Sequence, residues 1–361
     1  MRNLLVTGGA GFIGSHFVRC ALGADPSCHV VNLDRLTYAG SEDNLADLPD
    51  PARHRLVPGD IRDQALVEDL LHRHAIDTIV HLAAETHVDR SITSPAAFVE
   101  ANIVGTHALL EAARRCWLQG GQVRAGRRFH HVSTDEVYGD LGPNAPPCRE
   151  DAAYSPSSPY AASKAAADHL VRAYERTYGL PTSLSNCPNN YGPFQHPEKL
   201  IPVVITSALE GQPIPLYGDG LQRREWLFVE DHVRAIWRIL EQGRPGQTYH
   251  IGGTWHGSNR EIVEKVCDLI DVVRPSSSPS PRRSLVRFVS DRPGHDRRYA
   301  LNNDKIAGEL GWHSPTSLEA GLTATVNWYL GHPEWLARRR QSPGFQEWIE
   351  TNYAGRGEAA R

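Results

Sequence analysis

Short apolar runs alternate with amphipathic stretches over the first half of the chain. The runs contain many β-branched residues and show no polar–apolar alternation: NLLVTG (3–8), HVVNLD (29–34), TIVHLAA (78–84) and RFHHVST (128–134). Between them, apolar side chains recur at three- and four-residue spacing over 13–22, 64–74 and 96–116. Strands buried on both faces and separated by helices are typical of a parallel sheet. The pattern predicts an α/β fold with a doubly wound parallel sheet.

The pattern changes from about residue 186 onward. Pro, Gly and Trp become frequent, and the apolar segments become shorter. We expect residues 1–185 to form the main domain and 186–353 to form mainly a smaller α/β domain, with some segments returning to the first sheet. The last eight residues, 354–361, are expected to be a disordered tail.

The composition excludes several classes of partner. The chain has 361 residues, a formal net charge of −4 and 22% charged residues, so nothing in its charge favours nucleic acid or an acidic membrane. No apolar run approaches the roughly 20 residues that span a bilayer, and the apolar start is too short for a signal peptide. The six cysteines show no metal-ligand spacing. We expect a cytoplasmic protein with no bound metal, nucleic acid or membrane.

A glycine motif follows the first predicted strand. TGGAGFIG places Gly8, Gly11 and Gly14 between a strand and a helix, where a tight turn lets backbone N–H groups approach a diphosphate. Asp34 ends the second strand, twenty residues beyond Gly14. An acidic side chain there accepts hydrogen bonds from a ribose and repels a 2′-phosphate, which favours NAD over NADP in a Rossmann-type domain. Arg35 comes next and could bind that phosphate.

Two adjacent acidic residues follow the fourth strand. In FHHVSTDEVYGD (129–140), Asp135 and Glu136 stand side by side although their charges repel. One interpretation is a helix capping box, in which Ser133 caps the helix and Glu136 returns a hydrogen bond. The other is a site that needs two carboxyl groups. This stretch alone leaves both open.

Tyr160 and Lys164 lie four residues apart on a predicted helix, so they share one face about a turn apart. A nearby ammonium stabilises a tyrosinate and lowers the phenol pKa, which makes tyrosine a usable base. Only four of the 38 basic residues are lysines. Arginine cannot replace a lysine whose compact ammonium is needed, so Lys164 is a candidate for function.

From residue 3 to about residue 250, these motifs together resemble the extended branch of the short-chain dehydrogenase/reductase superfamily. TDEVYG resembles the sugar-nucleotide 4,6-dehydratases, most closely those acting on dTDP-glucose. The resemblance implies a carbon–oxygen lyase whose tightly bound NAD is regenerated in each turnover. It implies that Tyr160 removes the 4-hydroxyl proton, Thr134 binds the 4-oxygen, Glu136 removes the C5 proton and Asp135 protonates the departing 6-hydroxyl. The capping box is then disfavoured.

The resemblance implies further contacts along most of the chain. Expected at NAD are Gly8, Gly11, Phe12, Ile13, Gly14, Asp34, Arg35, Leu36, Thr37, Asp60, Ile61, Leu82, Ala83, Ala84, Tyr160, Lys164 and Asn190. Expected at the nucleoside-diphosphate hexose are Thr86, Thr134, Asn189, Lys199, Leu200, Pro215, Tyr217, Arg224, Asn259, Arg292 and His295. The family also implies a homodimer, packed through helices 96–116 and 160–177.

Four residues depart from the family's pattern: Thr86 and Pro188 replace serines, Ala101 replaces a threonine, and Arg223 adds a charge beside Arg224. These departures leave room for another nucleoside-diphosphate hexose, such as UDP-glucose. A 4-epimerase or a decarboxylase is a further alternative, although epimerisation needs no C5 base and the decarboxylases resemble TSEVYG. A dinucleotide sensor without catalysis would be expected to lack Tyr160 or Lys164.

Overall fold

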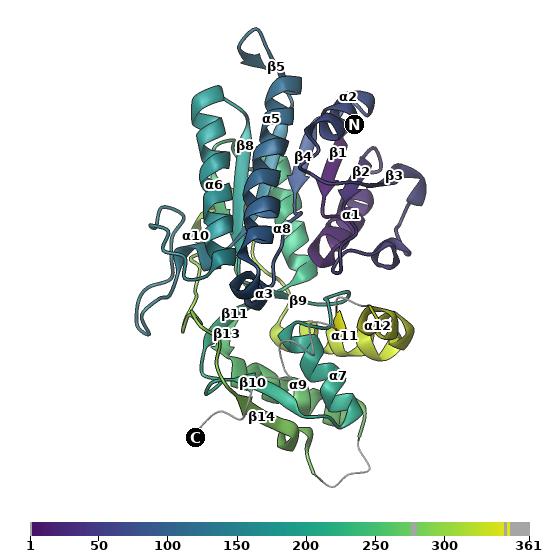
Figure 1. Cartoon of the computed structure of the whole chain (residues 1–361), viewed down its shortest axis with the longest axis vertical. Coiled ribbons are helices and arrows are strands. Elements are labelled where there is room, and N and C mark those ends of the chain that lie inside the picture. Colours follow the sequence, from purple (N-terminus) through teal and green to yellow (C-terminus); the bar gives the residue numbers. More distant parts are fainter. Residues whose placement is uncertain (1, 276–279, 343–344, 347–361) are drawn as a thin grey trace.

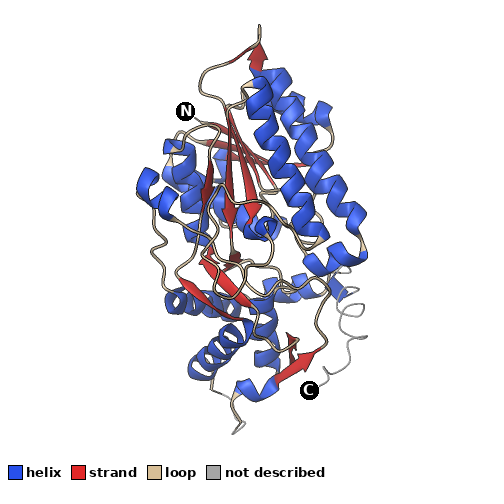
Figure 2. Cartoon of the chain, turned by 90° about the vertical axis from the view of Figure 1, so that its left-hand side faces the viewer, coloured by secondary structure: helices blue, strands red, loops and turns tan. Residues whose placement is uncertain are grey.

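The computed structural model describes residues 2–275, 280–342 and 345–346, and its main feature is a seven-stranded parallel sheet. The order is β12-β8-β7-β4-β1-β2-β3, and every neighbouring pair is parallel. The strands are β1 (Asn3–Thr7), β2 (His29–Asp34), β3 (His54–Pro58), β4 (Thr78–His81), β7 (Arg128–Thr134), β8 (Thr182–Cys187) and β12 (Thr248–His250). This arrangement confirms the doubly wound fold, and Figure 2 shows the sheet between layers of helices.

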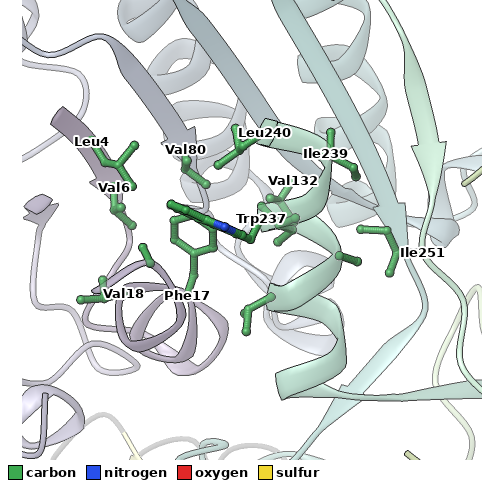
Figure 3. Close-up of a cluster of buried hydrophobic side chains, with 14 of the residues drawn as sticks. Leu4, Val6, Phe17, Val18, Val80, Val132, Trp237, Ile239, Leu240 and Ile251 are labelled. Carbon is green, nitrogen blue, oxygen red and sulfur yellow. The ribbon is translucent and has the colours of Figure 1, made fainter. Parts of the chain in front are cut away.

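Each face of the sheet is covered by its own helices. The helices are α1 (Phe12–Ala24) and α8 (Val229–Gln242) on one face, and α2 (Gln64–Arg73), α5 (Gly105–Trp117) and α6 (Pro159–Tyr178) on the other. Leu4 and Val6 of β1 pack with α1 and α8, whereas Leu5 packs on the opposite side. Successive side chains of a strand point to opposite faces, so a strand covered twice needs an unbroken apolar run. Figure 3 shows the first of these two cores, around Phe17 and Trp237.

The centre of the helix predicted over 96–116 is π-helical rather than α-helical. The helix consists of α4 (Pro95–Phe98), a π-helical segment η3 (Val99–Val104) and α5. The chain is therefore continuously helical over the predicted range, and only its centre departs from α-helical geometry. Within η3, the Asn102 Oδ1 accepts from the Glu85 amide at 2.8 Å, and Nδ2 donates to Ser163 Oγ at 2.8 Å. The π-helical segment thus ties the loop after β4 to α6, as such segments often do near functional sites.

A second hydrophobic core lies in the later part of the chain. Its strands are β9 (Asn189–Tyr191), β11 (Arg223–Phe228) and β13 (Trp255–Ser258) in one sheet, and β10 (Ile214–Tyr217) with β14 (Val286–Val289) in another. Its helices are α7 (Leu200–Glu210), α9 (Asn259–Val273), α11 (Leu318–Gly331) and α12 (Pro333–Arg340). Figure 1 shows these elements below the large sheet.

The later half also contributes to the large sheet, because α8 packs on α1 and β12 pairs with β8. The domain boundary near residue 185 stays a prediction, and the predicted tail at 354–361 lies outside the described residues. The remaining elements are short: α3 (Val88–Thr93), α10 (Asp304–Leu310), β5 (Leu118–Gln119), β6 (Gln122–Val123), η1 (Glu42–Leu45), η2 (Pro51–Arg53), η4 (Asp135–Tyr138) and η5 (Arg282–Leu285). Within the described ranges, none of the helices combines the length and apolar character that crossing a membrane requires.

Candidate active site

The turn between β1 and α1 can be built only with glycine at two positions. Gly8 has a φ of 74°, and a Cβ on it would lie 2.6 Å from the Ala83 amide nitrogen. A Cβ on Gly14 would lie 2.1 Å from the Gly8 carbonyl oxygen. Gly11 caps α1 without a side-chain hydrogen bond. No capping side chain occupies the backbone N–H groups of the first helical turn, so these groups can donate hydrogen bonds to a diphosphate.

Asp34 is held in place at the end of β2. Its Oδ2 accepts from the Ala10 amide at 2.9 Å and its Oδ1 from the Leu36 amide at 2.8 Å. Burial raises the pKa of Asp34, and these two amides oppose that rise. Arg35 lies instead beside Asp60, with Nε 3.6 Å from Oδ2. The carboxylate rather than the guanidinium is thus fixed where a ribose would lie.

Two cavities of about 330 and 190 Å³ lie at the carboxyl ends of the parallel strands. Every residue predicted at NAD except Leu36 lines the larger cavity, and Leu36 contributes its backbone amide to Asp34. Every residue predicted at the sugar nucleotide except Thr134 lines the smaller one, and Thr134 lines the larger. Five residues line both: Thr86, Glu136, Asn189, Glu198 and Lys199. The residues predicted to bind NAD and those predicted to bind the sugar nucleotide therefore adjoin each other at Glu136.

The acidic pair follows β7 in a short 3₁₀ turn. Thr134 caps this turn, its hydroxyl accepting from the Glu136 amide at 3.3 Å. Ser133 Oγ donates to Asp168 instead. The capping box with Ser133 as the cap is therefore wrong, although a cap one residue later does exist. This turn places Asp135 inside the protein and Glu136 at the junction of the cavities.

The two carboxyl groups have different electrostatic surroundings. Burial raises the pKa of Asp135 well above its ordinary value, and the charges of Glu136 and Glu225 add to the rise. Burial also raises the pKa of Glu136, but three cations oppose that effect: Arg292, Arg224 and Lys199. The arrangement favours a protonated Asp135 beside an ionised Glu136.

Tyr160 and Lys164 share the buried face of α6, as predicted. Burial, followed by the charge of Glu136, raises the pKa of Tyr160 well above its ordinary value, while a hydrogen bond with Thr134 lowers it. The expectation that the Tyr160 pKa is lowered was therefore wrong for this structure, in which burial dominates. Burial also lowers the pKa of Lys164 to about 8.

The smaller cavity carries cations suited to a diphosphate. Lys199, Arg224 and Arg292 all line it. The Arg224 guanidinium is buried, 4.4 Å from the centre of the Tyr299 ring, and its NH2 donates to the Asp296 carbonyl at 2.8 Å. Charge-assisted hydrogen bonds from such groups recognise phosphate strongly.

The cavity residues that the sequence analysis did not assign include Asp89, Glu198 and Tyr299. Asp89 accepts from Tyr217 at 2.9 Å and from Arg292 at 3.2 Å. Glu198 is buried and lies 3.3 Å from the Arg90 guanidinium. Each stands in or beside a segment that carries assigned residues, and this neighbourhood was the available signal.

Comparison with known proteins agrees with this geometry. The model of the GDP-mannose 4,6 dehydratase family matches residues 5–325. The dTDP-glucose 4,6-dehydratase of Salmonella typhimurium is 50% identical to this chain, and the match covers 98% of this chain and 99% of that enzyme. That of Xanthomonas campestris pv. campestris strain B100 is 52% identical, covering 93% and 95%.

Solved structures show the same similarity. The dTDP-glucose 4,6-dehydratase DesIV of Streptomyces venezuelae, with NAD and TYD bound, has a TM-score of 0.84 at 47% identity, covering 93% of this chain and 99% of its own. The UDP-glucose 4-epimerase of Thermotoga maritima, with UDP-glucose, has a TM-score of 0.79 at 27% identity, covering 92% and 99%. The chain therefore belongs to the GDP-mannose 4,6-dehydratase family.

Proposed function

We propose that this chain is an NAD-dependent lyase that converts dTDP-glucose to dTDP-4-keto-6-deoxy-glucose. One observation carries the proposal: Glu136 stands where the two cavities meet, and its neighbour Asp135 lines the larger cavity together with Tyr160 and Lys164. A 4-epimerase would need no second carboxyl group at this place. The names of the curated relatives support dTDP-glucose as the substrate.

The residues of the larger cavity fit NAD. The β1–α1 turn, which admits no Cβ on Gly8 or Gly14, would take the diphosphate. Asp34 would accept hydrogen bonds from the adenosine ribose. NAD, when bound, supplies a hydride acceptor for C4 and later the hydride that C6 receives.

The protein's own groups would move the protons. Tyr160, whose phenol interacts with Thr134, would take the proton of the 4-hydroxyl. The 4-ketone acidifies the C5 hydrogen, which Glu136 would then remove because nearby cations favour its ionised form. Asp135, kept protonated by burial, would give a proton to the departing 6-oxygen, since hydroxide is a poor leaving group.

The first experiment gives the purified protein dTDP-glucose and UDP-glucose separately, in deuterated water and without added cofactor. We expect dTDP-glucose to lose one water and gain deuterium at C5, as seen by mass spectrometry. The same product from UDP-glucose alone would move the proposal to another base. Unchanged masses with both sugars would overturn the proposed function.

The two carboxyl groups should fail at different steps. In Glu136→Gln, bound NAD should still be reduced by the substrate, but neither water loss nor C5 exchange should exceed about one hundredth of the normal rate. In Asp135→Asn, C5 exchange should persist while water loss falls by a similar factor. Deuterium incorporation and product mass, measured in parallel, separate the two. Equal losses of exchange in both variants would contradict the assignment.

Asp34 should set the choice of dinucleotide. In Asp34→Asn, NAD should bind about tenfold or more weakly, because an ionic acceptor is lost, and NADP should gain because the repulsion is removed. Calorimetric titration of cofactor-stripped protein measures both affinities. Asp47→Asn is a matched control, because Asp47 pairs with Arg19 and does not line the cavity. An unchanged preference in Asp34→Asn would contradict this role.

We also propose a homodimer formed through η3, α5 and α6. Figure 1 shows α5 and α6 side by side, and the adjoining η3 has two exposed apolar side chains, with Val99 and Val104 both 47% exposed. The double variant Val99→Glu, Val104→Glu should halve the mass measured by light scattering. Val272→Glu, at a 76% exposed position on α9, should leave it unchanged. A monomeric wild-type protein would refute the dimer.

We further infer that the protein works in the cytoplasm. All six cysteines are free thiols, as is usual in reducing compartments.

A further inference from the structure

Asp168 is a fully buried carboxyl group that the proposed mechanism does not use. Tyr160, Lys164 and Asp168 follow one another at four-residue intervals on α6, so their side chains project from one face. Tyr160 and Lys164 line the larger cavity, and Asp168 does not. Because a buried carboxylate is strongly destabilising unless it is paired, its partners indicate what it does.

The contacts of Asp168 suit an ionised carboxylate. Its Oδ2 accepts two hydroxyl hydrogen bonds, from Ser133 at 2.8 Å and from Tyr154 at 2.9 Å. The Tyr154 oxygen in turn accepts from Arg172 NH2 at 2.7 Å. Burial raises the pKa of Asp168, while Lys164 and the two hydroxyl donors oppose that rise. Donors that point at one oxygen favour its charged form.

His131 lies between this carboxylate and the lysine. Its Nε2 is 3.3 Å from Asp168 Oδ1 and 3.3 Å from Lys164 Nζ. Burial, with the charge of Lys164, lowers the pKa of His131 well below its ordinary value, so the ring is neutral. The Lys164 ammonium also donates to the Val132 carbonyl at 2.9 Å. The Nε2 of a neutral ring either accepts from Lys164 or donates to Asp168, but not both at once. Lys164 therefore keeps at least one of its three donors for the cavity that it lines.

We propose that Asp168 is a positioning residue that supplies the counter-charge of the Lys164 ammonium across His131, and so keeps this lysine charged beside Tyr160. The inference rests on the proposed role of Lys164. Among the described residues, no carboxylate forms a direct ion pair with Lys164. Asp168 is the first of the charges that raise the Lys164 pKa against the effect of burial.

Other titratable groups face this cluster from the neighbouring elements. From β4, the His81 ring lies 5.0 Å from that of His131, and burial keeps it neutral. From β8, Cys187 is a buried thiol whose pKa is raised. Tyr160, with Tyr154 and Arg172, also faces the cluster. The charges of Asp135 and Glu136 act on Tyr160 and Cys187, whereas Asp168 is the carboxylate whose charge raises the Lys164 pKa.

The scarcity of lysine makes a direct test possible. With lysine labelled by ¹³C at Cε, the full chain should give four lysine signals, and Lys164→Arg identifies the one from Lys164. Titration by NMR measures the Lys164 pKa without any turnover. Asp168→Asn keeps the size of the side chain but removes its charge. The Lys164 pKa should therefore fall in this variant, and its acid dissociation constant should rise about tenfold or more.

Tyr154→Phe is the matched control, because it removes one hydrogen bond to Asp168 and keeps the charge. Its effect on the Lys164 pKa should be much smaller than that of Asp168→Asn. Asp168→Glu, which keeps the charge, should hold the Lys164 pKa close to its wild-type value. The proposal would be overturned if Tyr154→Phe and Asp168→Asn lowered the Lys164 pKa equally, or if neither variant lowered it. If Asp168→Asn does not fold, the wild-type titration still decides, because a lysine already neutral at pH 7 would refute the proposal.

A kinetic measurement separates this inference from the proposed function. Reduction of bound NAD by dTDP-glucose should fall as pH rises through the Lys164 pKa, because the ammonium is lost. In Asp168→Asn this alkaline limb should move to lower pH by the same amount as the Lys164 pKa. A wild-type protein that never reduces NAD refutes the function, and the NMR result then stands alone. An active variant with an unmoved limb refutes the role of Asp168.

Discussion

The carboxyl groups of Asp135 and Glu136 repel each other when both are ionised, so the charges around them decide which of the two holds a proton. Asp135 is buried at the end of the large sheet, near the charge of Glu225. Glu136 instead feels three cations, Lys199, Arg224 and Arg292. All three come from the later half of the chain, and all three line the smaller cavity. The later half therefore sets the charge state of acids that the sheet positions, besides providing a place for a diphosphate.

The other catalytic pair depends on the opposite face of the same strand. Along β7, Val132 packs into the core below α8, whereas Ser133 contacts Asp168 of α6 and His131 lies between Asp168 and Lys164. This alternation lets one short strand support the lysine through its side chains and continue directly into the acidic pair. A change of register along β7 would disturb both sets together.

Parts of the site that depend on local geometry could be predicted from the sequence. The glycine turn and Asp34 belong to one strand–turn–helix unit, and the spacing of Tyr160 and Lys164 is a property of a single helix. Features that depend on tertiary packing could not be predicted. The raised pKa of Tyr160 comes from burial. Glu198 reaches both cavities from the loop before α7. Asn102 of the π-helical segment contacts Glu85, which lies seventeen residues earlier in the chain. The sequence around Tyr160 and around the π-helical segment carries no sign of these effects, and around Glu198 it marks only the segment that enters the site.

The departures from the family's pattern are unevenly distributed in space. Thr86 lines both cavities, whereas Ala101 and Pro188 line the larger one. Arg223 lines neither, because it is exposed at the start of β11, while the buried Arg224 lines the smaller cavity. The walls around Tyr217, Asn259 and His295 keep the expected residues. Three of the four departures therefore gather in the larger cavity or at its junction with the smaller one, away from the residues proposed to bind the nucleotide.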